Sequence, residues 1–369
     1  MWKLTAAWWR SAFAWTALVL WLGILFATLY PFEFHPHNDV EWLKGGLRFG
    51  QHGIVTSDGP LMTGSTGEDS SCSMEILLKP GTLAGSNRFL VFSSSHNSEQ
   101  IKLTQYRDGI IVWRGSGQGK NRRGGKRDVV HFFNSWEPML LTLTSGPKGA
   151  SVYSNGRLLE RFPGYSLSRE AMRDTFVFGA DTAHIDTWTG QLRGLALYAR
   201  ELSPSEVVEN YHMWILGPGE RCDIGKDRTA LFTFQEGQGT VVRNLCASGG
   251  NLTIPPTFAL PAKPFLATPW QEFAPTWDYA NDLIRNILGF VPFGFALCGY
   301  LWLSGRKSKA VLIAILLGAA TSLGIEILQG FIPQRESGLT DVVTNTLGTA
   351  LGAFLFAWQP IGRYLHNLP

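Results

Sequence analysis

The sequence predicts a membrane α-helical bundle of four spans with an all-β sandwich inserted between spans 1 and 2. Four long apolar stretches carry the first half of this prediction, because about 20 apolar residues in a helix cross the roughly 30 Å hydrocarbon core. Short β-rich runs broken by Gly, Pro, Asn and Ser carry the second half. The stretches are 11–30, 284–303, 310–331 and 341–358. The predicted parts are 1–44 (N-terminal span and juxtamembrane segment), 45–270 (sandwich) and 271–369 (three-helix membrane region).

The first apolar stretch has two interpretations. Lys3 and Arg10 before an apolar run also describe a cleaved signal peptide. However, the run approaches twenty residues, is rich in Trp and ends at Tyr30-Pro31-Phe32-Glu33 without a small-residue cleavage site. These features favour a retained membrane helix.

The basic residues predict the orientation of the spans. Arg306, Lys307 and Lys309 lie in the loop between the second and third spans, and basic loops stay in the cytoplasm. The same rule places Lys3 and Arg10 inside. The residues between the first and second spans are therefore expected on the extracytoplasmic side.

A pair of glycines predicts close helix packing. Gly348 and Gly352 in the last span have the GxxxG spacing that lets two helices approach closely. The third span offers small residues as the matching surface, namely Gly318, Ala319, Ser322 and Gly324. We expect the third and fourth spans to pack there.

Charge and cysteine content argue against nucleic-acid binding and against a metal or cofactor site. A net charge of +3 is too small to indicate nucleic acid. The basic residues between 120 and 127 (Lys120, Arg122, Arg123, Lys126 and Arg127) fit a solvated loop. The four cysteines have no metal-ligand spacing, so we expect no metal site or cofactor. Cys298 fits a packed side chain, and Cys222–Cys246 is a candidate disulfide, although spacing alone cannot establish the geometry.

The middle of the chain shows one hairpin and one helix clearly. Asn155-Gly156 is a typical two-residue turn between β-rich runs. Ser203 fits a helix N-cap, with Pro204 at the first helical position and Glu206 completing a capping box.

These same residues carry a resemblance. Val152–Arg157 and Gly190–Glu206 resemble the "Y-x-N-G" turn and the following strand and helix of the concanavalin A-like, laminin-G-type (LamG) jelly roll. Residues 231–254 resemble a strand that often opens that domain, which leaves the order of strands open. Members of this family bind glycans, bind proteins or only fold.

Glycan binding would require exposed aromatic and polar side chains in the sandwich. Trp113, Trp136, Trp188 and Tyr165 are candidates, with Asp181 and Asp186 as polar partners or calcium ligands. The alternative, which we favour, is that the aromatics belong to the core and the acids cap loops.

Polar residues gather at the predicted outer ends of three spans. Asp282 and Asn286 begin the second span. Glu326 lies about 24 Å along the third at about 1.5 Å per residue, and Gln329 follows on the same face. Arg335 lies in the outer loop, and Asp341 and Asn345 begin the last span. Ionisable groups at this depth are costly and are functional-site hypotheses by default.

These residues resemble a second family, the VanZ-like membrane proteins. Its pattern matches Asn286–Gly294, Ser322–Gln329, and Arg335 with Asp341–Gly348, and the first span ending in Thr28–Phe32 also suits it. The resemblance implies a bacterial cytoplasmic (inner) membrane protein, and an association with low-level resistance to teicoplanin-type glycopeptides through an unsettled mechanism. The large sandwich is the main departure.

Two interpretations of the polar residues remain open and are compatible. Glu326, Arg335 and Asp341 could form an ion-pair and hydrogen-bond network that locks the helix ends. Alternatively they line an outward-facing site, with Arg335 binding an anionic head group. In that site Glu326 and Asp341 would act as acid and base, and Gln329, Asn286, Asn345 and Asp282 would complete it.

The predicted function is binding or modifying a lipid-linked or glycan component of the cell envelope at the outer leaflet, with membrane lipids as further partners. The alternative is a non-enzymatic, membrane-anchored recognition module for a glycan or a protein. A small-solute transporter fits less well, because four helices enclose little volume.

Overall fold

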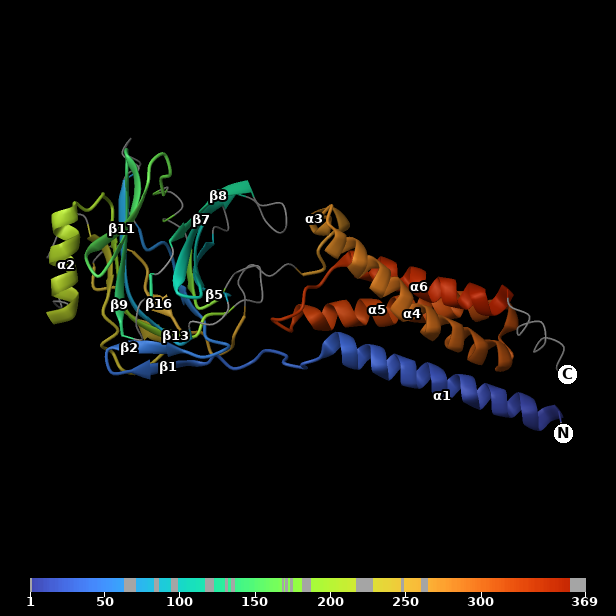
Figure 1. The fold of residues 1–369 in the computed structure, drawn as a ribbon. Helices are drawn as coiled ribbons and strands as arrows, with labels where there is room; N and C mark the ends of the chain where they lie inside the picture. The colour runs from blue at the N-terminus through green and yellow to red at the C-terminus, as the bar shows by residue number, and fades with distance from the viewer. Residues whose placement is uncertain are drawn as a thin grey trace. The chain divides into compact units, whose positions relative to one another are not determined.

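The computed structural model describes most of the chain (Figure 1). The described residues are 2–62, 71–82, 86–93, 99–116, 123–129, 132–133, 137–167, 169, 172, 175–180, 187–216, 228–246, 249–259 and 265–358. They form two compact units: residues 1–34 with 263–369, and residues 35–262. Each unit is described by itself.

The first unit contains four helices long and apolar enough to cross a membrane, which confirms the predicted spans. Short α3 (Pro269–Glu272) precedes the second of them. The four long helices are α1 (Trp2–Leu29), α4 (Trp277–Leu303), α5 (Ala310–Gly330) and α6 (Leu339–Trp358).

Helix packing in this unit differs from the prediction in one respect. A side chain at Gly348 would collide with the Ile287 carbonyl oxygen, and one at Gly352 with that of Val291. Both carbonyls belong to α4, so the GxxxG face of α6 packs on α4 and not on α5. The α5–α6 contact uses Gly318 instead, which lies against the Thr349 side chain.

The second unit is the predicted antiparallel sandwich. One sheet has the strand order β1-β2-β13-β4-β9-β10-β11, and β14 also pairs with β13. Its strands are β1 (Val40–Leu43), β2 (Gly46–Phe49), β4 (Cys72–Pro80), β9 (Met139–Gly146), β10 (Gly149–Ser154), β11 (Arg157–Phe162), β13 (Gly190–Tyr198) and β14 (Arg228–Phe232).

The other sheet has the order β15-β16-β3-β12-β5-β6-β7-β8. Its strands are β3 (Val55–Ser57), β5 (Ser86–Ser93), β6 (Glu99–Tyr106), β7 (Gly109–Ser116), β8 (Arg123–Val129), β12 (Thr175–Phe178), β15 (Val241–Val242) and β16 (Leu252–Thr253). The late strand β14 lies beside β13, and β16 lies beside β3. Strands late in the sandwich sequence thus belong to both sheets, one beside another late strand (β13) and one beside an early strand (β3). This pairing gives the strand order that the sequence left open.

The local motifs of the sandwich form as predicted. Asn155 and Gly156, with φ of 50° and 78°, make the turn that pairs Ser154 with Arg157. Helix α2 (Pro204–Leu216) begins after Ser203, whose backbone N–H donates to the Glu206 carboxylate at 2.8 Å. The capping box is therefore formed.

A buried carboxylate joins α2 to the sheet. Glu75 of β4 accepts hydrogen bonds from Tyr198 Oη at 2.8 Å, Asn210 Nδ2 at 2.9 Å and Trp214 Nε1 at 3.0 Å. Burial raises the pKa of Glu75, and the three donors oppose that rise. This network is not predictable from the sequence, because Glu75 has the position of a solvent-facing polar residue in an ordinary strand.

Candidate functional site at one end of the helix bundle

Helices α4, α5 and α6 bring polar side chains together at one end of the bundle. On α5, the side chains of Ser322, Glu326 and Gln329 follow at intervals of four and three residues, so they share one face, and all three are buried. On α6, half-buried Asp341 and buried Asn345 are four residues apart. The regular helical spacing thus sets two polar faces that meet.

Hydrogen bonds join these faces across the helices. Asn286 Nδ2 of α4 donates to Asp341 Oδ1 at 2.7 Å. Asn345 Nδ2 donates to Ser322 Oγ at 2.9 Å, and Ser322 Oγ donates to the Asp341 carbonyl at 3.4 Å. Three of the predicted residues therefore belong to one network, and Ser322 belongs to it as well.

Glu326 is held by the loop that follows α5. Glu326 is only 1% exposed, and its Oε2 accepts a hydrogen bond from the Gly338 backbone N–H at 2.8 Å. Ser337 Oγ donates to the Glu326 carbonyl at 2.7 Å. The loop thus folds back over the end of α5 and encloses the carboxyl group.

Arg335 and Gln329 contact α1. The Arg335 guanidinium donates to the Tyr30 carbonyl at 2.8 Å and to the Ala27 carbonyl at 3.1 Å. Gln329 Nε2 donates to the Thr28 carbonyl at 2.9 Å. The last carbonyls of a helix have no partner within it, so these two side chains cap α1.

This arrangement corrects the predicted ion-pair network. Among the ion pairs found in the described residues, none joins Arg335 to Glu326 or Asp341. The charged groups close enough to act on Asp341 are the carboxylates of Glu272, Asp282 and Glu336. The cluster is held by amide, hydroxyl and backbone donors, while the Arg335 side chain contacts the end of α1 instead.

Asp282 and Glu272 lie at the edge of the cluster. Asp282 is exposed and interacts with Asp341 only at a distance. Glu272, at the end of α3, accepts from the Thr340 backbone N–H at 3.1 Å and from Thr340 Oγ1 at 2.5 Å. Sequence reasoning missed Glu272, because the acid that caps α6 comes from a distant segment of the chain.

The described residues contain no group of three His, Cys, Asp or Glu side chains arranged to hold a metal ion. Among the cysteines, Cys72 and Cys298 are buried thiols, and Cys246 is disulfide-bonded. Cys222, its predicted partner, lies outside the described residues.

Two of the aromatic candidates in the sandwich, Trp188 and Tyr165, belong to its core. Trp188 is 2% exposed and donates from Nε1 to Gln105 Oε1 at 2.9 Å. Tyr165 is 6% exposed, and burial raises its pKa to about 12. Trp113 is half-buried, with Lys102 Nζ 5.8 Å from its ring centre. Trp136, Asp181 and Asp186 lie outside the described residues.

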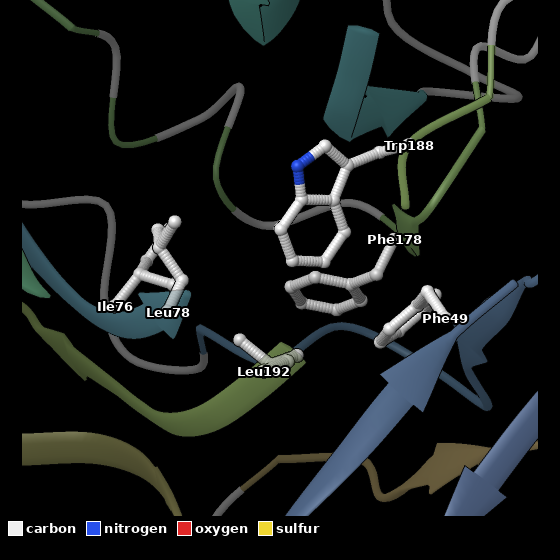
Figure 2. Close-up of a pocket in the computed structure, with 6 residues that line it drawn as sticks. All are labelled: Phe49, Ile76, Leu78, Phe178, Trp188 and Leu192. Carbon is white, nitrogen blue, oxygen red and sulfur yellow. The ribbon is translucent and has the colours of Figure 1, made fainter. Parts of the chain in front are cut away.

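Figure 2 shows a small cavity beside Trp188, between the two sheets. Its volume is about 10 Å³, room for roughly one water molecule, and its walls are apolar. A sugar does not fit there. The lining residues are Phe49, Ile76, Leu78, Phe178, Trp188 and Leu192.

The fold and the polar cluster define a multi-pass membrane protein with an antiparallel sandwich between its first two spans. Residues 231–360 match the family model of VanZ/LLP1. Residues 50–208 match a laminin-G model described as the concanavalin A-like lectin/glucanases superfamily. The chain is thus similar, in two separate parts, to the two families that its motifs resemble.

Solved structures resemble the chain weakly. The receptor binding domain of botulinum neurotoxin D is 18% identical, with a TM-score of 0.35, over 50% of this chain and 48% of that one. The aligned part therefore spans about half the length of that domain. The CBM40 of Ruminococcus gnavus IT-sialidase, bound to alpha2,3 sialyllactose, is 12% identical, with a TM-score of 0.31, over 39% of this chain and 83% of that one. No curated protein gives a significant match.

Proposed function

We propose that the protein binds a lipid-linked or glycan component of the bacterial envelope at the outer leaflet of the cytoplasmic membrane. The observation that carries this proposal is the polar cluster of Glu326 and Asp341. Two carboxyl groups from different membrane helices share one end of the bundle, and the charged groups that act on both are other carboxylates. Such groups are expensive in a membrane, and function is the usual reason for keeping them.

The acceptors of the cluster suggest what each residue contributes. Asp341 is only half-buried, so it is the carboxylate that an arriving ligand would meet first. Asn345 is 4% exposed, and its Oδ1 is buried without a hydrogen-bond partner. A ligand bearing hydroxyl or amine donors complements these acceptors, and Glu326 and Asp341 would transfer protons if the ligand is modified.

The sandwich supports the glycan part of the proposal through its match to a lectin-type family model. Trp113 is the described aromatic candidate that keeps partial exposure. Glycopeptide resistance is the phenotype to follow, because the membrane region matches VanZ/LLP1.

A second candidate is a recognition module whose polar cluster serves folding alone. The capping of α1 by Arg335 and Gln329 favours it, because both side chains already have structural roles. In that case the sandwich binds the ligand and the cluster does not.

Purified Asp341→Asn and Glu326→Gln variants test the proposal through mass analysis of co-purified lipids. We expect both variants to remain folded and to lose the bound component that the wild type retains, and to change teicoplanin susceptibility in cells. The matched control is Thr346→Ala on α6, whose hydroxyl donates to the Val342 carbonyl of its own helix.

Two results would contradict the proposal. If both variants fold and retain the same lipids and the same susceptibility as wild type, the cluster takes no part in binding. If both variants disappear from the membrane while Thr346→Ala is stable, the folding role is the correct one.

A further inference from the structure

The segment Phe265–Trp277, here called the aromatic strap, exposes large apolar side chains. Trp277 is 79% exposed, Trp270 77%, Phe273 56% and Phe265 54%. The strap contains α3 and ends at Trp277, the first residue of α4, in the same unit (Figure 1). Adjacent exposed aromatics are unusual on a water-facing surface and mark an interaction site.

One polar side chain of the strap bonds to α6, and two others bond each other. Thr268 and Gln271 bond each other in a capping box. Glu272 accepts both bonds from Thr340. Glu272 therefore ties the strap to α6, while Gln271 and the aromatic side chains are exposed.

The backbone fixes the strap at the level where α5 ends and α6 begins. Ala267 donates to the Ser337 carbonyl at 2.9 Å and accepts from the Leu339 backbone N–H at 2.8 Å. Helix α6 has 20 residues and is therefore about 30 Å long, which equals the hydrocarbon thickness. Its first turn, and the strap bonded to it, thus lie near the boundary between hydrocarbon and headgroups.

The exposed surface of the strap continues the lipid-facing surface of the spans. The Phe265 ring lies 6.3 Å from that of Phe331, which is itself 43% exposed just beyond α5. Leu328 on α5 and Val343 on α6 are 40% and 53% exposed. Trp is the side chain most suited to this depth, because its ring is apolar and its N–H can reach water or headgroups.

We propose that the aromatic strap docks on the interfacial zone of the lipid bilayer, with Trp270, Phe273 and Trp277 at the level of the glycerol and headgroups. The partner is the bilayer that holds the spans. The strap thereby holds Glu272 against the first turn of α6, next to Asp341. This surface is independent of the ligand proposed above, since it lies outside the hydrogen bonds of the polar cluster.

Spin labels on the full chain in phosphatidylcholine nanodiscs test this proposal. The labels are attached in Trp270→Cys, Phe273→Cys and Trp277→Cys, and the matched control is Val208→Cys, 43% exposed on α2 of the sandwich. The native thiols of Cys72 and Cys298 are both 0% exposed and should not react. Helical circular dichroism and elution volume select the folded variants. Because three positions are labelled, the test can still be made if one variant does not fold.

The relaxation of each label by apolar oxygen is then compared with its relaxation by a water-soluble nickel chelate. The expected result is that oxygen is more effective than nickel at the strap positions, and that nickel is more effective at Val208→Cys. The proposal is overturned if the nickel chelate relaxes the strap labels as strongly as it relaxes the control label. Protection from both reagents would also overturn it, because that result indicates a protein partner.

Discussion

Arg335 shows how a side chain within a matching motif can serve a different element from its neighbours. Its sequence position suggested a partner for Glu326 and Asp341, yet its guanidinium binds the carbonyls of Ala27 and Tyr30. The Glu326 carboxyl group instead accepts a hydrogen bond from the Gly338 backbone N–H. The cause is that the last carbonyls of α1 are strong acceptors without partners of their own.

Glu206 provides the pH-dependent prediction at this scale. Its pKa is lowered to about 2, first by the hydrogen bonds from Arg200 and then by those from Ser203. The folded pKa lies below the ordinary value of 4.5, so the stabilisation is full above about pH 4.5 and is lost as the pH falls towards 2. We expect Glu206→Gln to lower the free energy of unfolding by about 0.5–1 kcal/mol at pH 7, since the pair is partly exposed and screened.

Denaturant unfolding of the full chain in detergent, at pH 7 and at pH 3, measures this difference. The control is Glu209→Gln, an exposed acid on the same helix. The difference between wild type and Glu206→Gln should shrink at pH 3, and a difference that grows at pH 3 would contradict the assignment.

At the scale of elements, glycines decide which helices touch. Gly352 approaches the α4 backbone so closely that an added methyl group would overlap the Val291 carbonyl and lie 2.7 Å from the Phe295 nitrogen. Backbone cannot move aside as a flexible side chain can. The α4–α6 contact therefore depends on the absence of a side chain at Gly348 and Gly352.

The matched pair Gly352→Ala and Gly324→Ala tests this contact. Gly324 has nothing within 4 Å of an added methyl group, so that change should be neutral or stabilise α5 by up to about 1 kcal/mol. Gly352→Ala should destabilise the bundle by about 1–3 kcal/mol through overpacking. Thermal unfolding in detergent gives the comparison, and equal melting temperatures for the two variants would refute the close contact.

At the scale of the whole molecule, the chain leaves the membrane region after α1 and returns to it at α4. The sandwich has its own core between two sheets, and the helices have separate apolar clusters. The basic loop between α4 and α5 predicts that this loop is cytoplasmic and that the sandwich is outside.

A membrane-impermeant maleimide on spheroplasts tests this orientation. Leu158→Cys places a thiol on exposed β11, and Ser308→Cys places one in the basic loop. Leu158→Cys should react in intact spheroplasts, whereas Ser308→Cys should react only after lysis. The opposite pattern would invert the predicted topology.

The sequence by itself determined the four spans, the sandwich between them and the local motifs. These features depend on apolar run length, strand patterning and nearest-neighbour turn chemistry, all of which are written within a few consecutive residues. The spacing of Asp341 and Asn345, and of Glu326 and Gln329, likewise predicted shared helix faces.

Only the tertiary structure decided which groups meet. It assigned Arg335 and Gln329 to α1, the glycines of α6 to α4, and Glu272 to Thr340. The physical reason is the same in each case. Helix capping, backbone contact and burial are satisfied by partners distant in sequence, and side-chain chemistry alone allows several partners for each group.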